Sequence, residues 1–329
     1  MTTLREQAEQ YLQLRRALGY KLADHGHLLM QFIGYLEQQG AATVTIEAAV
    51  TWAMRPAAGT PSWWRYRLAV VRCFARHLAS ADPHCQVPPA NLLPRASQRQ
   101  APYLFTPTQI QALIDAPARL FRQPLRIATY QALISLLWVT GMRTGEAIRL
   151  DRDHLDLSAG HLDVIDSKYG KSRTLLLHAT TVSALAGYAE LRDQAAGQAG
   201  SPAFFVSTRG RLLVNTVDYT FAGLVAAAGI TVAPGVRAPR PTDLRHSFAV
   251  TTLTDWYRSG ADVCARLPVL STWMGHLSPA STYWYLQASP ELLAQAAKRL
   301  EDPIPPMTAG GLSWPRSRRS FKRSSPTTW

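Results

Sequence analysis

Four short segments in the second half of the chain carry residue types suited to chemistry on a phosphate ester. They are TGMRTGEAIRL, SKYGKS, PTDLRHSFAV and WMGHLSPASTYWYL, and their candidate residues are Arg143, Lys168, Arg245, His276 and Tyr285. Guanidinium groups bind phosphate oxygens in bidentate fashion, and a tyrosine hydroxyl can attack phosphorus. Each segment alone could equally be structural, as part of an ion pair, a solvated turn or the packed core. Their occurrence together indicates one phosphoryl-transfer site.

The order and spacing of these segments resemble the tyrosine site-specific recombinase, or phage integrase, family. The family patterns are a glycine-flanked arginine with an acid three residues later, a lysine in a β-turn, His-x-x-Arg, Gly-His, and a tyrosine nine residues after that histidine. The resemblance covers about 103–300, and the helical segment 1–85 resembles the family's core-binding domain. It implies a mainly α fold, with an N-terminal helical domain and a mostly helical α/β catalytic domain containing a small antiparallel sheet.

The resemblance also implies a role for each candidate residue. Arg143 and Arg245 would hold the phosphate and neutralise charge that builds up in the transition state. Tyr285 would form a phosphotyrosyl link to the 3′ end of the cut strand, with the 5′ hydroxyl as leaving group. Lys168 would protonate that leaving oxygen, and His276 would donate to a phosphate oxygen. Because the covalent link conserves bond energy, rejoining would need no cofactor and no metal, and the sequence contains no P-loop or two-metal carboxylate cluster.

Two of these positions have competitors nearby. Lys171 lies in the same turn as Lys168, but the family register favours Lys168, three residues before a second lysine and five before an arginine. Tyr283 lies close to Tyr285, yet only Tyr285 has the nine-residue spacing. Glu146, three residues after the first arginine, would brace that region of the site.

One position departs from the family pattern. The residue three before the second arginine is usually a histidine, often assigned as general base, and here it is Thr242. Threonine can donate a hydrogen bond but has no useful pKa for accepting a proton. His246 is an added histidine familiar in the family and normally structural, and on a helix it points about 100° away from Arg245. The enzyme could therefore be slow, fully active or a degenerate copy.

Composition supports a nucleic-acid partner. The chain has 329 residues, 47% of them hydrophobic, and a net charge of +13, which favours a polyanion as partner. No run of about 18 apolar residues and no secretory signal is present, so we expect no membrane association and a cytoplasmic, nucleoid-associated protein. Cys73, Cys85 and Cys264 are odd in number and scattered, which fits a reducing compartment.

Residues 1–80 are predicted to be helical. Apolar stripes recur at helical spacing, with the members Leu4, Ala8, Tyr11, Leu12 and Leu18, then Leu29, Phe32, Ile33 and Leu36, then Trp64, Leu68, Val71, Ala75 and Leu78. A further helix is expected to start at Thr45. Arg65, Arg72 and Arg76 share one face of the last helix, which is either a solvated surface or a DNA-contacting one.

The proline-rich stretch 86–102 predicts a linker between the helical domain 1–85 and a catalytic domain 103–303. Thr106, Pro107 and Gln109 form a capping box that starts the next helix. Strands are expected at 161–166 and 173–178, and helices at 130–140, 182–193, 216–228, 243–258 and 290–300. The basic tail 304–329 is predicted to be disordered when free.

The favoured function is a recombinase that integrates, excises or transposes a mobile element. An alternative is a Xer-like resolvase of chromosome or plasmid dimers, and another is a non-catalytic DNA-binding remnant, which Thr242 alone supports. The partner is double-stranded DNA. By resemblance to the family we expect a homotetramer on DNA, in which an apolar helix after Ser289 docks on the neighbouring subunit or else packs on its own domain, and possible accessory recombinases.

Overall fold

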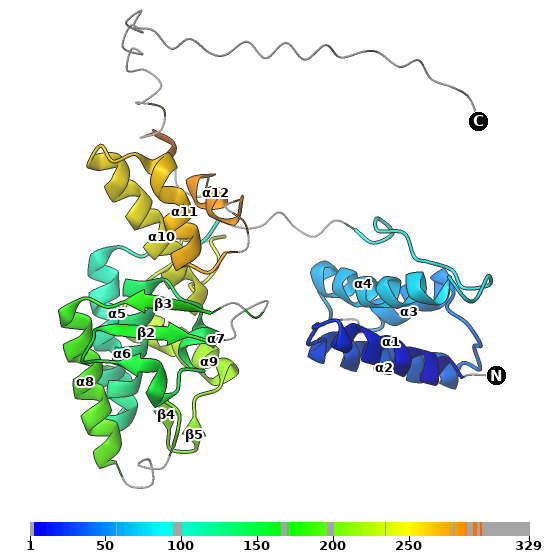
Figure 1. The fold of residues 1–329 in the computed structure, drawn as a ribbon, viewed down its shortest axis with the longest axis horizontal. Helices are drawn as coiled ribbons and strands as arrows, with labels where there is room; N and C mark the ends of the chain where they lie inside the picture. The colour runs from blue at the N-terminus through cyan, green and yellow to red at the C-terminus, as the bar shows by residue number, and fades with distance from the viewer. Residues whose placement is uncertain are drawn as a thin grey trace, which may run out of the picture. The chain divides into compact units, whose positions relative to one another are not determined.

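A computed structural model describes residues 3–56, 58–94, 101–165, 170, 172–195, 201–233, 235–276, 278, 280–287, 292–294 and 297. The chain divides into two compact units, Met1–Gln100 and Ala101–Trp329. Each unit has its own hydrophobic core, and Figure 1 shows the helices and strands of both units. The predicted tail 304–329 lies outside the described residues.

The first unit consists of four helices. These are α1 (Leu4–Ala17), α2 (Ala23–Gln38), α3 (Ile46–Met54) and α4 (Pro61–Leu78). The stripe predicted for the second helix forms the centre of the core, since Leu29, Phe32, Ile33 and Leu36 are all buried. Thr45 is the N-cap of α3, as expected, and its hydroxyl accepts the backbone N–H of Ala48.

The first helix ends earlier than its apolar stripe predicted. Leu18 is the C-cap of α1, and its side chain is 65% exposed. The cause is Gly19, whose φ of 88° reverses the chain. The N–H groups of Gly19 and Tyr20 then bond back to the carbonyls of Arg16 and Arg15. Leu18 therefore does not belong to the buried stripe.

The beginning of the predicted linker packs on the first unit. The backbone N–H of Gln86 donates to the carbonyl of Val44, and its side chain accepts the N–H of Ile46. Leu93 is buried in the core formed by the four helices. Residues 86–94 therefore lie on this unit, and residues 95–100 of the linker lie outside the described part of the chain.

The second unit is mainly helical. Its helices are α5 (Pro107–Leu120), α6 (Pro124–Thr140), α7 (Thr144–Ala147), the 3-10 turn η1 (Arg152–His154), α8 (Ala179–Gln194), α9 (Val214–Ala227), α10 (Pro241–Arg258), α11 (Val263–Trp273) and α12 (Ala280–Gln287). The predicted capping box is present at the start of α5, because Thr106 and Gln109 bond reciprocally. α11 and α12 were not predicted. Pro268 lies inside α11 and disguises it in the sequence.

Two small antiparallel sheets interrupt the helices. β1 (Leu155–Asp156), β2 (His161–Val164) and β3 (Arg173–Leu176) form one sheet in that order, and β4 (Val206–Ser207) and β5 (Gly210–Arg211) form the other. The second and third strands pair from His161↔Leu176 to Val164↔Arg173. Both are shorter than predicted, but the mainly α fold with a small antiparallel sheet is confirmed.

Two clusters make up the core of the second unit. The larger lies around α6, whose buried residues include Leu133, Leu136 and Leu137. The smaller joins α10, α11 and α12 and contains Leu253 and Tyr285 (Figure 1). Within the described residues, no helix is long and apolar enough to cross a membrane.

Most of the helix predicted for 290–300 lies outside the described residues. One of its described members, Leu292, is buried in the smaller cluster, and its neighbour Leu293 is 53% exposed. At Leu292 the segment therefore packs on its own domain.

Candidate active site

The first arginine follows the end of the buried helix α6. Gly141 ends that helix in the left-handed conformation, with φ of 61°. A Cβ at this position would lie 2.3 Å from the ring of Phe248 in α10, so only glycine fits. The chain then turns, and Arg143 becomes the N-cap of α7. The glycine before the arginine therefore allows α10 to pack closely against the end of α6.

Arg143 is held on two sides and remains partly open. One guanidinium nitrogen lies 2.7 Å from Oε1 of Glu146, and another donates to the carbonyl of Gly275 at 3.1 Å. The backbone N–H of Arg143 also donates to Glu146. These bonds fix the guanidinium in place. Because the side chain is still 31% exposed, the guanidinium can also reach a bound anion.

Glu146 is shared by two arginines. Its carboxylate is buried and also accepts hydrogen bonds from the guanidinium of Arg173, at 2.8 and 3.4 Å. Burial raises the pKa of Glu146, but the bonds from Arg173 and Arg143 outweigh it and lower that pKa to about 2. The carboxylate is therefore charged at any ordinary pH and is hydrogen-bonded to both guanidiniums.

Arg173 is a site residue that the sequence did not identify as one. In the sequence, Arg173 is only the arginine that lies five residues after Lys168. In the structure it is the first residue of β3 and forms an ion pair with Glu146. The signal that could have revealed it is the need of a buried carboxylate for a second cation. Through its bond to Glu146, Arg173 thus links the start of β3 to the first arginine, Arg143.

Arg245 lies in the second turn of α10 and is almost fully buried. It donates to the carbonyl of Gly141 and to that of Met274, both at 2.7 Å. Burial lowers the pKa of Arg245 to about 10, although the nearby Tyr285 acts in the opposite direction. The guanidinium therefore remains a cation at neutral pH.

The end of α11 collects three guanidinium groups on three consecutive carbonyls, which we call the 273–275 turn. Arg173 donates to the carbonyl of Trp273 at 2.7 Å, Arg245 to that of Met274, and Arg143 to that of Gly275. The last carbonyls of a helix lack partners within it, so cations are favourable there. The turn therefore fixes the arginines relative to one another.

His276 follows that turn directly. Its Nδ1 lies 2.7 Å from the hydroxyl of Thr282 in α12. Burial, followed by the positive charges of Arg245, Arg143 and Arg173, lowers the pKa of His276 to about 4. The imidazole is therefore neutral at physiological pH, and one of its nitrogens can donate to a phosphate oxygen.

Tyr285 lies among these groups on α12. Its ring is stacked on that of His276, with 6.0 Å between centroids, and only 3% of the residue is exposed. Its competitor Tyr283 is 51% exposed. Of the two tyrosines, only Tyr285 thus lies against the arginine–histidine group.

Thr242 and His246 differ in their surroundings. Thr242 is exposed in the first turn of α10, whereas His246 is buried. The ring of His246 lies 5.1 Å from that of Trp284 and 5.4 Å from that of Tyr285. His246 is thus a packing neighbour of the tyrosine ring.

Lys168 and its competitor Lys171 lie outside the described residues. The strands on either side are described, and the last pair of their ladder is Val164↔Arg173. The described strand pair that flanks both lysines in the sequence therefore ends at Arg173, which bonds to Glu146.

The three arginines of α4 that were predicted to contact DNA, Arg65, Arg72 and Arg76, are not equivalent. Arg72 donates to the carbonyls of Pro88 and Pro89 at 2.6 and 2.8 Å, and Arg65 donates to that of Pro94 at 3.3 Å. Arg76 is exposed at the surface of α4. Two members of the predicted DNA-binding face thus anchor the segment that follows α4.

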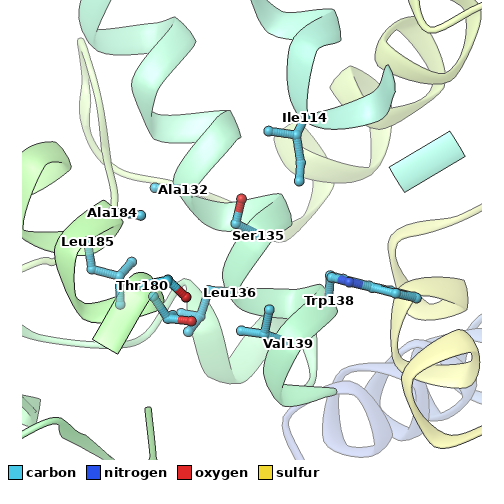
Figure 2. A pocket seen from close by; sticks show the side chains of 10 residues that line it. Ile114, Ala132, Ser135, Leu136, Trp138, Val139, Thr180, Ala184 and Leu185 are labelled. Atoms are coloured by element: carbon cyan, nitrogen blue, oxygen red, sulfur yellow. The ribbon is translucent and has the colours of Figure 1, made fainter. Parts of the chain in front are cut away.

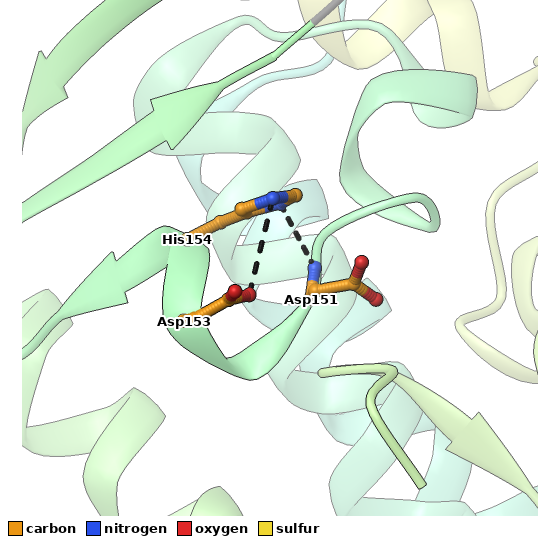
Figure 3. Close-up of side chains that lie close together, drawn as sticks. All are labelled: Asp151, Asp153 and His154. Carbon is orange, nitrogen blue, oxygen red and sulfur yellow. Dashed lines mark hydrogen bonds and ion pairs between the residues drawn. The ribbon is translucent and has the colours of Figure 1, made fainter.

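One cluster of metal-ligand types occurs among the described residues. Asp151, Asp153 and His154 lie together at η1 (Figure 3). The carboxylate of Asp151 is paired with Arg211, and Nδ1 of His154 accepts the backbone N–H of Asp151 at 3.1 Å. These contacts cap a turn and leave Asp151 neutralised.

A small pocket lies between α5, α6 and α8 (Figure 2). Its volume is about 210 Å³, below the range of about 300–1,000 Å³ usual for small-molecule sites. The lining is mostly apolar, with Trp138, Leu136 and Leu185 among its members. None of the candidate catalytic residues lines it.

Comparison with known proteins agrees with this geometry. The profile of the phage integrase family matches residues 104–291. The integrase/recombinase y4rB of Sinorhizobium fredii is 42% identical over 307 residues, covering 92% of this chain and 98% of that protein. Tyrosine recombinase XerD of Mycobacterium leprae is 32% identical over 218 residues, covering 63% and 64%.

A solved structure of the Tn1549 transposon integrase with a circular intermediate DNA has the same fold, with a TM-score of 0.62 and 16% identity. The alignment covers 91% of this chain and all of that one. Fold, site and sequence together define a DNA-breaking and rejoining enzyme. The chain belongs to the phage integrase family of tyrosine site-specific recombinases.

Proposed function

We propose that this recombinase cuts and rejoins double-stranded DNA through a 3′-phosphotyrosyl intermediate on Tyr285. The observation that carries the proposal is the meeting of Arg143, Arg245 and His276 with the buried Tyr285 around one turn. Two fixed cations, a neutral donor and a nucleophile are the groups that attack on a phosphodiester requires.

In the forward step the hydroxyl oxygen of Tyr285 bonds to phosphorus and the bond from phosphorus to the 5′ oxygen breaks. Arg143 and Arg245 bind the non-bridging oxygens, and His276 donates to one of them. The proton of the phenol is lost to solvent or a base, and Lys168 gives a proton to the leaving 5′ oxygen. Attack by a 5′ hydroxyl of the partner strand reverses these changes, so no external energy source is required.

We propose a mobile element as the biological substrate, to be integrated, excised or transposed. The similarity to y4rB extends over nearly the full length of both proteins, whereas the similarity to XerD covers 63% of this chain. A Xer-like resolvase of chromosome or plasmid dimers is the second candidate, because Xer recombinases are also relatives. A non-catalytic remnant is the third, because Thr242 stands where the family usually has a histidine that serves as general base.

We further propose that the DNA partner is held by both units, with 1–85 as core-binding domain and 103–303 as catalytic domain, and that a homotetramer forms on DNA. The charge of +13 supports binding to a polyanion. A solved lambda integrase with the same fold is a dimer bound to a core site, which supports assembly of several subunits on DNA. Accessory recombinases and action at the nucleoid in the cytoplasm are parts of the same proposal.

Trapping of a covalent adduct tests the proposal. The enzyme is incubated with DNA from the ends of its own element, nicked so that the cleaved strand diffuses away, and analysed on denaturing gels. The wild type and Tyr283→Phe should form the adduct, and Tyr285→Phe should bind DNA without forming it. An adduct with Tyr285→Phe would refute the nucleophile, and no adduct from any form would favour the remnant. Joining of element ends, as opposed to resolution of dimers, would separate the first two candidates.

A further inference from the structure

The contact between His276 and Thr282 joins two parts of the site that the family motif treats separately. Thr282 is fully buried, and its hydroxyl lies 2.7 Å from Nδ1 of His276. It precedes Tyr285 by three residues on α12, so both side chains lie on one face of the same helix.

The buried threonines of the helices differ in their partners. Thr220 accepts a hydrogen bond from the hydroxyl of Tyr130 on another helix, whereas Thr129 and Thr140 donate to the carbonyls of Leu125 and Leu136, four residues earlier in their own helix, at 2.7 and 2.6 Å. Thr282 instead bonds to a side chain of another segment. Its hydroxyl is therefore not explained by local helix geometry.

A neutral imidazole has one nitrogen that donates and one that accepts. His276 is neutral because burial and the surrounding arginines lower its pKa to about 4. The hydroxyl of Thr282 can donate to Nδ1 or accept from it. If the hydroxyl donates, the ring proton must lie on Nε2. That tautomer can donate to a phosphate oxygen, whereas the other would present a lone pair to it.

We propose that Thr282 is a positioning residue that holds His276 as the Nε2–H tautomer. Because Thr282 and Tyr285 share α12, docking of that helix delivers the nucleophile and orients the histidine in one event. A subunit whose α12 is displaced would then lose both functions together. The inference rests on the proposed roles of His276 and Tyr285.

The test compares Thr282→Val, which keeps the shape and removes the hydroxyl, with Thr282→Ser, which keeps the hydroxyl. Loss of a group that orients a catalytic histidine should slow adduct formation by about tenfold to hundredfold, by analogy with partners that orient metal-binding histidines. DNA affinity should be unchanged in both variants, and Thr282→Ser should retain most of the rate. A Thr282→Val enzyme as fast as wild type would overturn the inference.

A double-mutant cycle of Thr282 and His276 separates a positioning role from a general effect on stability. In a His276→Gln background, Thr282→Val should have little further effect, because the group it positions is gone. An equal loss in both backgrounds would overturn the inference. In the wild type, nitrogen-15 spectra should show the His276 proton on Nε2, and a proton on Nδ1 would also overturn it. If Tyr285→Phe still forms an adduct, the proposed function fails; if only the Thr282 results fail, that function stands.

Discussion

At the scale of single residues, the site contains more positive than negative groups, and hydrogen bonds hold its guanidiniums in fixed positions. Two guanidiniums, those of Arg143 and Arg173, bond to the carboxylate of Glu146, and a third, that of Arg245, is held by backbone carbonyls. Because the donors are oriented before substrate arrives, little reorganisation is required as charge develops on the phosphate. Burial, together with the same positive charge, lowers the pKa of His276 and keeps it neutral.

The exposed Thr242 allows a direct test of the missing base. Since its side chain is exposed, Thr242→His should be accommodated without a clash. If proton removal limits the rate, adduct formation should become up to about a hundred times faster, a modest share of the range for general-base help. The gain should grow above about pH 6.5, where imidazole is neutral. Rates are compared from pH 5.5 to 8.5.

Thr242→Ala is the control for that experiment and should behave like the wild type at each pH. A rate that falls with histidine, or that rises without dependence on pH, would contradict a base-limited step.

Glu146 and His276 predict how the stability of the catalytic domain depends on pH. The folded pKa of Glu146 is about 2, below its ordinary 4.5, so its stabilisation is present above pH 4.5 and is lost as pH falls toward 2. The folded pKa of His276 is also lowered, from 6.5 to about 4. Because the unfolded chain then binds the proton more readily, the free energy of unfolding declines as pH falls from 6.5 to 4. Urea unfolding of wild type, Glu146→Gln and His276→Gln at each pH measures both. A Glu146→Gln curve parallel to the wild type between pH 4.5 and 2 would contradict the first assignment.

At the scale of elements, the 273–275 turn and Arg173 connect β3, α7 and α10. A Cβ on Gly275, whose φ of 66° favours glycine, would lie 2.6 Å from the guanidinium of Arg173 and would push it away from its partners. β3, which follows the segment with Lys168 in the sequence, is therefore bonded to the arginine site through the side chain of Arg173.

Arg173→Met should leave the buried Glu146 with one cation instead of two. Removing one partner of a buried ion pair costs about 3–5 kcal/mol, and we expect a loss at the lower end because Arg143 remains. Adduct formation should also fall more than DNA affinity, because Arg143 and the lysine hairpin lose their common support. Thermal unfolding and adduct assays measure the two effects. The double variant Arg173→Met, Glu146→Gln should recover part of the stability, and a further loss would contradict the pairing.

In the first unit, Arg72 and Arg76 should separate structure from DNA contact. Arg72→Met removes two charged hydrogen bonds to Pro88 and Pro89, which should lower the free energy of unfolding by about 1–3 kcal/mol. Arg76→Met should change stability by less than about 0.5 kcal/mol. If Arg76 contacts phosphate, its loss should weaken DNA binding and lower the salt slope by about 1. Equal stability losses would contradict the distinction.

At the scale of the whole molecule, two compact units with separate cores favour binding of DNA by both. Removing residues 1–95 or 96–329 should each weaken binding. For the full chain, a plot of the logarithm of the binding constant against the logarithm of salt concentration should have a slope of about −0.9 for each phosphate contacted. Fluorescence anisotropy at several salt concentrations measures this. Unchanged affinity after either truncation, or a flat salt response, would refute joint binding.

The sequence by itself determined what is local in this protein. Periodicity predicted the buried face of α2, a capping box predicted the start of α5, and the nine-residue interval selected Tyr285 over the exposed Tyr283. These features depend on residues within a few turns of one another, which a linear pattern can encode. The motifs that indicated the family are of the same kind.

Tertiary structure alone decided which groups meet. Arg143 bonds to a carbonyl 132 residues away, Arg245 to one 104 residues away, and Arg173 to a carboxylate 27 residues away. Such partners depend on how helices pack, and packing leaves no periodic trace in the sequence. For the same reason the arginine face of α4 looked uniform as a pattern, although Arg72 turns to backbone carbonyls that its own helix does not supply.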